Sequence, residues 1–190
     1  MCYAISERMM NMPLANQKIY TTEDIYTLPE GERAELIDGK IYYMAPPSRS
    51  HQELLHFLDR TIGNYLHIKN GPCKIYPAPF AVFLNENNSN YVEPDLSIIC
   101  DRKKLTEKGC NGAPDWIIEI VSPSSRRMDY YVKLFKYRTA GVHEYWIIDQ
   151  ERNRITVYNF VQDTFNEYQF TDTVKVGIYE DLEIPFADFS

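Results

Sequence analysis

Apolar residues recur at two spacings along this chain, and these spacings predict helices and strands in alternation. The stretch from Ser48 to about Lys69 has the helical spacing, with Leu54 and Leu58 on one face. Ser48 is suited to cap the start of this helix, and Asn70-Gly71-Pro72 is suited to end it. The pattern therefore predicts one long amphipathic helix in the first half of the chain.

Two near-continuous apolar runs, Asp95 to Cys100 and Asp115 to Val121, predict strands with both faces covered. A helix from about Arg126 to Thr139 follows the second run, and Val142 to Asp149 predicts another buried strand. If the strands before and after this helix are parallel neighbours, the three elements form a βαβ crossover.

Shorter elements surround this core. Ala34 to Met44 predicts a hairpin, because Asp38-Gly39 is a two-residue turn signal between apolar runs. Lys74 to Leu84 predicts an edge strand, since two prolines interrupt it. A meander of strands is expected after Asn153, and residues 1–16 are expected to be a loose arm. The fold class is α/β or α+β, with a mixed central sheet flanked by helices in one domain over residues 1–190.

Charge and composition narrow the function classes. The hydrophobic content of 44% argues against disorder. A formal net charge of -7 argues against a protein that coats DNA non-specifically, because such proteins are basic overall. A nuclease stays open, since its acidic site can be neutralised by divalent cations.

The four cysteines show no CxxC pair and no zinc-type His spacing. Cys100, at the end of an apolar strand, is expected to be a small buried hydrophobe with a reduced thiol. Residues 1–13 lack the apolar core of a signal peptide, and no apolar run approaches the length of a membrane span. We expect a soluble, cytoplasmic chain that does not bind membranes.

Two acidic residues interrupt the apolar strands. Side chains alternate along a strand, so Asp115, Ile117, Glu119 and Val121 share one face. Glu119 is flanked by isoleucines, and burying an unpaired carboxylate is expensive. The ordinary explanation for Glu119 is that it pairs with an Arg or lies at an exposed edge position. The ordinary explanation for Asp95 is that it is a turn residue. If the two strands are adjacent, the two carboxylates predict a hard-cation site.

Lys133 is the candidate cation beside these acids. Tyr130, Leu134 and Tyr137 are expected to point inward from the following helix, with Lys133 beside them. The alternative is an ordinary Asp129–Lys133 ion pair at i, i+4, worth only about 0.3–0.5 kcal/mol.

Glu35 and His51 complete the candidate set. Glu35 lies in an apolar strand next to a turn, and is either a third site carboxylate or a solvent-facing residue. His51 lies in the first turn of the long helix, where a lone His is most often a surface or packing residue.

These residues carry a resemblance to a known group of enzymes. The chain resembles the PD-(D/E)XK nuclease superfamily and, within it, a family of uncharacterised bacterial restriction endonuclease-like proteins. The resemblance covers roughly residues 20–160. The matching segments are Glu35-Leu36-Ile37-Asp38-Gly39, Pro46-Pro47-Ser48 leading to His51, Glu93-Pro94-Asp95-Leu96, Glu119-Ile120-Val121, and Gly141 to Asp149.

The resemblance implies a restriction endonuclease-like core and a metal-dependent DNA endonuclease. It implies Mg²⁺ or Mn²⁺ held by Asp95, Glu119 and the backbone carbonyl of Ile120. In the superfamily motif a lysine stands two residues after the acid, but Val121 stands there in this chain. The resemblance implies that Lys133 takes its place. Glu35 would assist, and His51 would lie at the edge of the site.

Two other functions stay open. A nuclease fold that has become a dimeric binding module is favoured by the acidic charge and the missing strand lysine. A small-molecule phosphohydrolase could use the same metal site. The resemblance also implies a homodimer, because many nucleases of this fold cut DNA as dimers.

Overall fold

The computed structural model describes residues 18–85 and 87–189, and the arm predicted for residues 1–16 lies outside them. The helices are α1 (Thr22–Tyr26), α2 (Arg49–Lys69), a π-helical segment (Met128–Lys133) and α3 (Leu134–Ala140), with 3-10 turns at Arg102–Lys104 and Phe186–Phe189. The first strands are β1 (Ala34–Ile37), β2 (Lys40–Tyr43), β3 (Lys74–Pro77), β4 (Val82–Phe83), β5 (Tyr91–Val92), β6 (Leu96–Ile99), β7 (Leu105–Thr106) and β8 (Gly109–Asn111). The later strands are β9 (Trp116–Ile120), β10 (Glu144–Asp149), β11 (Arg154–Asn159), β12 (Thr164–Tyr168), β13 (Thr173–Lys175) and β14 (Glu183–Pro185).

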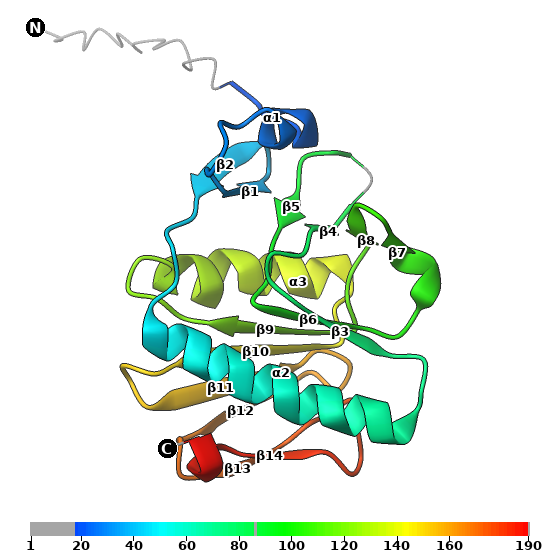
Figure 1. Cartoon of the computed structure of the whole chain (residues 1–190), viewed down its shortest axis with the longest axis vertical. Coiled ribbons are helices and arrows are strands. Elements are labelled where there is room, and N and C mark those ends of the chain that lie inside the picture. Colours follow the sequence, from blue (N-terminus) through cyan, green and yellow to red (C-terminus); the bar gives the residue numbers. More distant parts are fainter. Residues whose placement is uncertain (1–17, 86, 190) are drawn as a thin grey trace, which may run out of the picture.

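The central sheet has the strand order β12-β11-β10-β9-β6-β3 (Figure 1). β9 and β10 pair in parallel and the other neighbours pair antiparallel, so the sheet is mixed. The predicted βαβ crossover is therefore confirmed. β3 lies at the edge of the sheet, where a strand that ends in proline is tolerated.

A second six-stranded sheet, with the order β2-β1-β5-β4-β8-β7, was not predicted (Figure 1). Several of its strands are only two or three residues long, and residues 101–112 gave the pattern of a polar connection. Such short strands lack a readable alternation of side chains, because their pairing is decided by partners distant in sequence.

Both faces of β9 are covered, as its continuous apolar pattern predicts. Trp116, Ile118 and Ile120 pack in one cluster with the apolar side of α2. Ile117 packs on the other face, in a cluster that includes Tyr137 of α3. Because side chains alternate, Glu119 points toward α3 together with Ile117.

The turn and cap signals in the sequence correctly predict the β1–β2 turn and both ends of α2. Asp38 and Gly39 have φ of 49° and 71°, the left-handed pair that a two-residue hairpin turn needs. The Ser48 side chain accepts the backbone N–H of His51 at 3.2 Å, which caps α2. Asn70 ends this helix with φ of 48°.

The helix predicted from Arg126 to Thr139 is present, but it contains a full π-helical turn between Met128 and Lys133. Asp129, Lys133 and Tyr137 are the buried residues of this stretch. Tyr130 and Leu134, which were expected to point inward, are only partly buried. The wider turn changes which side chains face the sheet, and π-turns often occur at functional sites.

The expectation of reduced thiols was wrong for two of the cysteines, because Cys73 and Cys100 form a disulfide. The pairing of β3 with β6 places Lys74 opposite Ile99, so the next residues outward also lie opposite each other. Cys110 is free and buried. Within the described residues, no helix is long and apolar enough to cross a membrane.

An ion pair attaches the start of the crossover helix to the end of β10. Arg126 donates from Nε and Nη2 to the buried carboxylate of Asp149, at 2.8 and 3.1 Å. Burial would raise the pKa of Asp149, but the hydrogen bonds and charge of Arg126 outweigh burial and lower it. Ionised Asp149 therefore stabilises the fold above its unfolded pKa of about 3.9, and this contribution is lost as the pH falls through the folded pKa.

We expect Arg126→Met to lower the melting temperature at about pH 7, because the variant leaves a buried carboxylate without its bidentate partner. The difference in melting temperature between the variant and wild type should narrow as the pH falls from about 5 to about 3, because Asp149 of the variant becomes protonated and no longer needs a cation. Thermal denaturation at several pH values measures both effects. Arg138→Met is the control, since Arg138 pairs with the exposed Asp163, and it should change little. A difference in melting temperature that widens as the pH falls would contradict a stabilising role for the Arg126–Asp149 ion pair.

Candidate active site

A buried lysine joins three carboxylates from three different elements. The Lys133 ammonium lies 2.9 Å from Glu119 of β9 and 2.9 Å from Glu35 of β1. Asp129, one helical turn before Lys133, lies 3.8 Å away. Lys133 is 5% exposed and Asp129 is 1% exposed. Lys133 therefore contacts Glu119 and Glu35 and also pairs with Asp129, and its role as the site cation stays a prediction.

The hydrogen bonds around Glu119 and Glu35 fix both carboxylates. Glu119 Oε1 accepts the Tyr137 hydroxyl at 2.7 Å as well as the Lys133 ammonium. Glu35 Oε1 accepts the backbone N–H of Glu93 at 3.0 Å. The solvent-facing alternative for Glu35 was wrong, because the residue is only 4% exposed.

Asp95 lies opposite Glu119 because of strand pairing. β6 pairs with β9 so that Leu96 faces Ile118, and one further step of this register brings Asp95 to Glu119. Asp95 Oδ2 accepts the backbone N–H of Ile120 at 2.7 Å. This bond fastens the Asp95 carboxylate to the strand that carries Glu119.

His51 completes this side of the site. Its Nε2 lies 3.2 Å from Asp95 Oδ2, and its side chain is 13% exposed. Burial lowers the pKa of His51, but the hydrogen bond with Asp95 and the charge of that carboxylate act against burial, and the pKa is raised overall. His51 is therefore a packed partner of Asp95, which its position in the first turn of a helix did not by itself indicate.

One cavity of about 540 Å³ brings the candidates together. It is lined by residues of the β1–β2 hairpin, the first turn of α2, the end of β9, the start of the crossover helix and the segment that follows β10. The six predicted site residues all line this cavity, namely Glu35, His51, Asp95, Glu119, Ile120 and Lys133. Asp129 lines it as well. Val121, at the position expected for a strand lysine, also lines this cavity.

Burial and like charge change the protonation of this cluster. Burial raises the pKa of Glu119 well above its ordinary value, the carboxylates of Asp129, Asp95 and Glu35 add to this, and Lys133 opposes it. Burial likewise raises the pKa of Asp129 to about 6, although the charge of Lys133 and the hydrogen bond from Ser125 act to lower it. Burial would lower the pKa of Lys133, but the surrounding carboxylates hold it well above its ordinary range. Lys133 therefore stays charged, and the carboxylates compete for any remaining proton.

The donor set fits a hard divalent cation. When ionised, Glu35, Asp95, Glu119 and Asp129 exceed the single charge of Lys133 by three. Asp129 and His51 line the cavity, and one buried atom of each, Asp129 Oδ1 and His51 Nδ1, has no hydrogen-bond partner among the described residues. Mg²⁺ needs only one or two carboxylates and otherwise keeps its waters. A preformed group of three or more His, Cys, Asp or Glu ligands is absent from residues 18–85 and 87–189.

Two contributors to the cluster were missed from the sequence. The sequence pattern predicts Asp129 only as an ordinary ion-pair partner of Lys133, and Tyr137 only as an inward-facing aromatic residue. Asp129, Lys133 and Tyr137 recur every four residues, which is a signal for one helix face. The aromatic and apolar residues between them predict that a different face of the helix is buried. The π-helical turn determines that the face with Asp129 and Lys133 is the buried one.

Comparison with known proteins identifies the family. Residues 22–186 match a family model described as "Uma2: Putative restriction endonuclease". The chain belongs to the Uma2 family. Two relatives of this chain come from a Synechocystis sp. strain. "Uncharacterized protein sll1609" is 30% identical over 181 residues, which cover 93% of this chain and 97% of the relative. "Uncharacterized protein slr1290" is 26% identical over 149 residues, which cover 76% and 77%.

A solved structure supports the fold of this Uma2 chain. It is described as a putative nuclease belonging to DUF820 from Anabaena variabilis, and it superposes with a TM-score of 0.72 at 21% identity. The match covers 89% of this chain and 96% of that chain. The predicted restriction endonuclease-like fold is thereby confirmed. The family model, described as a putative restriction endonuclease, supports a nuclease-like function.

We expect Lys133→Met in this Uma2 chain to lower the free energy of unfolding by about 3–5 kcal/mol, because it leaves buried carboxylates without their cation. The loss should be larger at about pH 8 than at about pH 5. Without Lys133 the raised pKa values of Glu119 and Asp129 rise further, and protonation at low pH removes the repulsion. Urea denaturation in the presence of a chelator measures the difference.

Lys136→Met is the matched control on the same helix, because Lys136 pairs with the exposed Asp38. It should cost less than about 1 kcal/mol and show little dependence on pH. Equal losses in the two lysine variants would show that the buried cluster does not depend on Lys133.

Proposed function

We propose that this chain is a divalent-metal-dependent endonuclease that hydrolyses phosphodiester bonds in DNA. The observation that carries the proposal is the position of Lys133, whose ammonium lies 2.9 Å from both Glu119 and Glu35 inside the cavity that Asp95 also lines. A cation held against an excess of carboxylates is the combination that phosphodiester hydrolysis needs, because negative charge develops on the phosphate in the transition state.

Asp95, Glu119 and the backbone carbonyl of Ile120 would hold Mg²⁺ or Mn²⁺. Oxygen donors of this kind suit hard cations, and the Asp95–Ile120 hydrogen bond keeps two of the three groups adjacent. When bound, such an ion supplies Lewis-acid activation of water and offsets phosphate charge.

The other residues act by position and charge. Lys133 is fixed by Glu35 and Asp129, so its ammonium can stabilise developing negative charge or orient the attacking water without reorganising. Tyr137 holds Glu119 through its hydroxyl. His51 holds Asp95 through Nε2, and its raised pKa favours the protonated form that pairs with a carboxylate.

The rival function is a nuclease-fold binding module without catalysis. The specific observation in its favour is that Lys133 already contacts three of the four acids and so neutralises part of the cluster. The net charge of -7 also favours it. The two functions differ in catalysis, because only the nuclease should cleave DNA and should need Glu119 to do so.

The homodimer and the cytoplasmic location stay predictions. Large apolar side chains at the surface support the dimer, because an interface with a second copy would remove them from water. They lie on the crossover helix and on the turn and strand after β11, with exposures of 73% for Tyr131, 62% for Phe135, 70% for Val161 and 64% for Phe165.

We expect the wild-type chain to nick or linearise supercoiled plasmid when Mg²⁺ or Mn²⁺ is present and to be inactive with a chelator. Glu119→Gln and Asp95→Asn should each lower the cleavage rate by at least about 100-fold, because each removes a charged oxygen donor and keeps the side-chain shape. Gel assays of plasmid cleavage over time give the rates.

Glu53→Gln is the control, because Glu53 is a half-exposed carboxylate on α2 that pairs with Arg49 outside the cluster. It should cleave at the wild-type rate. Equal cleavage by the Glu119 variant and wild type, or no cleavage with either metal, would exclude this mechanism and favour the binding module.

A further inference from the structure

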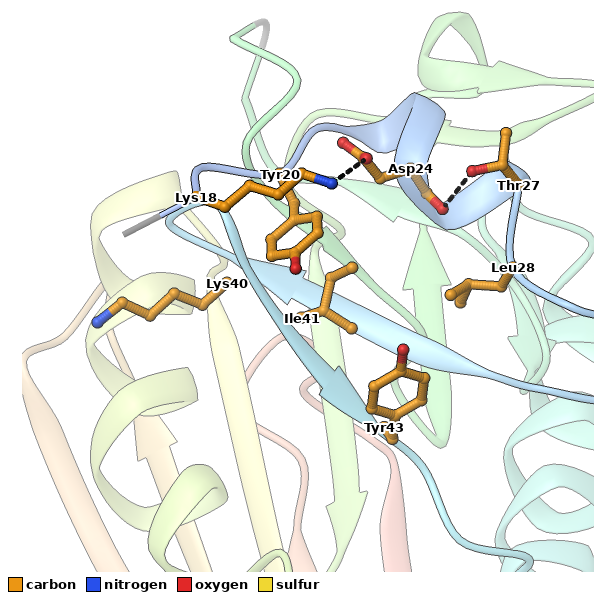
Figure 2. A pocket seen from close by; sticks show the side chains of 8 residues that line it. All are labelled: Lys18, Tyr20, Asp24, Thr27, Leu28, Lys40, Ile41 and Tyr43. Carbon is orange, nitrogen blue, oxygen red and sulfur yellow. Dashed lines mark hydrogen bonds and ion pairs between the residues drawn. The ribbon is translucent and has the colours of Figure 1, made fainter. Parts of the chain in front are cut away.

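A second hollow lies on the β1–β2 hairpin beside α1, with a volume of about 600 Å³. Figure 2 shows Tyr20, Ile41 and Tyr43 in a row along it. Lys18 and Lys40 lie at the Tyr20 end of this row. The hollow thus combines aromatic rings with two ammonium groups, and the nuclease proposal uses none of them.

Tyr43 connects this hollow with the active-site cavity, because it lines both. It is the last residue of β2, and residues 44–48 continue along the wall of the cavity to the start of α2. Its side chain is 66% exposed, which is unusual for a tyrosine beside a core. A chain-like ligand in the cavity could therefore continue over Tyr43 into the hollow.

The charges favour an anionic ligand on this side. The Lys40 ammonium has no ion pair or side-chain hydrogen bond within the part of the chain that the structure describes. Lys18 lies 4.4 Å from the centre of the Tyr20 ring and 3.6 Å from Asp24, so its charge is shared.

Cations on the cavity wall are already paired with carboxylates. Arg33 donates from Nε to Glu93 at 3.0 Å, and Lys133 lies within the acidic cluster. A nucleic acid backbone that is repelled by the acids thus finds the uncommitted ammonium of Lys40 at the hairpin.

We propose that this hollow binds an unpaired strand of DNA next to the bond that is cut, with a base stacked on Tyr43 and phosphates near Lys40 and Lys18. Stacking on a side chain requires a free base face, which a paired and stacked duplex does not offer. The inference rests on the proposed nuclease function and deepens it. It assigns to the enzyme a substrate with a single-stranded segment, such as a flap or a frayed end.

The test measures binding without cleavage. Fluorescence anisotropy in a chelator compares a labelled single-stranded DNA oligonucleotide with the duplex of the same sequence. We expect wild type to bind the single strand more tightly than the duplex. Tyr43→Ala should weaken single-strand binding by about 5- to 100-fold, and Tyr43→Phe should keep most of it. Lys40→Gln should reduce the dependence of log K on log salt by about one.

Matched controls separate the hollow from general surface effects. Ile68→Ala removes a large apolar side chain that is 79% exposed near the end of α2, away from the hollow. Lys175→Gln removes one exposed positive charge on β13. Both controls should bind like wild type. Any of three results would overturn the proposal. They are a Tyr43→Ala variant that binds like its control, a duplex bound as tightly as the single strand, and tighter binding of the matching RNA strand.

The binding test and the plasmid test can fail separately. If single-strand binding depends on Tyr43 but no metal supports cleavage, the strand site stands and the nuclease function fails. If plasmid is cleaved but binding does not depend on Tyr43, the nuclease function stands and the strand site is wrong.

Discussion

The burial of Lys133 among Glu35, Glu119 and Asp129 is the interaction on which the site depends. Each of these charges would be costly to bury alone, and the cost is met only because they lie within 3–4 Å of the ammonium. The cluster joins the hairpin of the second sheet, the middle of β9 and the crossover helix. It therefore fixes the position of the two sheets at the point where the cavity opens.

The same cluster leaves the charge balance incomplete. Lys133 cannot neutralise four carboxylates, and the remaining negative charge is concentrated where Asp95 and Glu119 lie opposite each other on adjacent strands. Tyr137 and the Ile120 amide hold these two carboxylates in place from different sides. A rigid site with excess negative charge is prepared to accept a cation, because little reorganisation is needed when it binds.

An acidic chain can act on a polyanion if its positive groups are placed beside the acids. Arg33 lines the cavity but is occupied with Glu93, and Arg126 is occupied with Asp149. Lys40 is uncommitted, and it lies on the hairpin that also supplies Glu35. The hairpin thus contributes one residue to the acidic cluster and offers an anchor for the backbone of a substrate.

Local chemistry in the sequence determined the hairpin turn at Asp38-Gly39, the limits of α2 at Ser48 and Asn70, and the two-faced burial of β9, since each depends on neighbouring residues alone. The register that singled out Glu119 also followed from alternation. The tertiary structure decided what depends on distant partners. It paired the short strands of the second sheet, joined Cys73 to Cys100, and widened one helical turn so that Asp129, Lys133 and Tyr137 face the acids. The reason is physical: turns, caps and periodicity are short-range, whereas strand pairing and the balance of buried charge arise only when the segments meet.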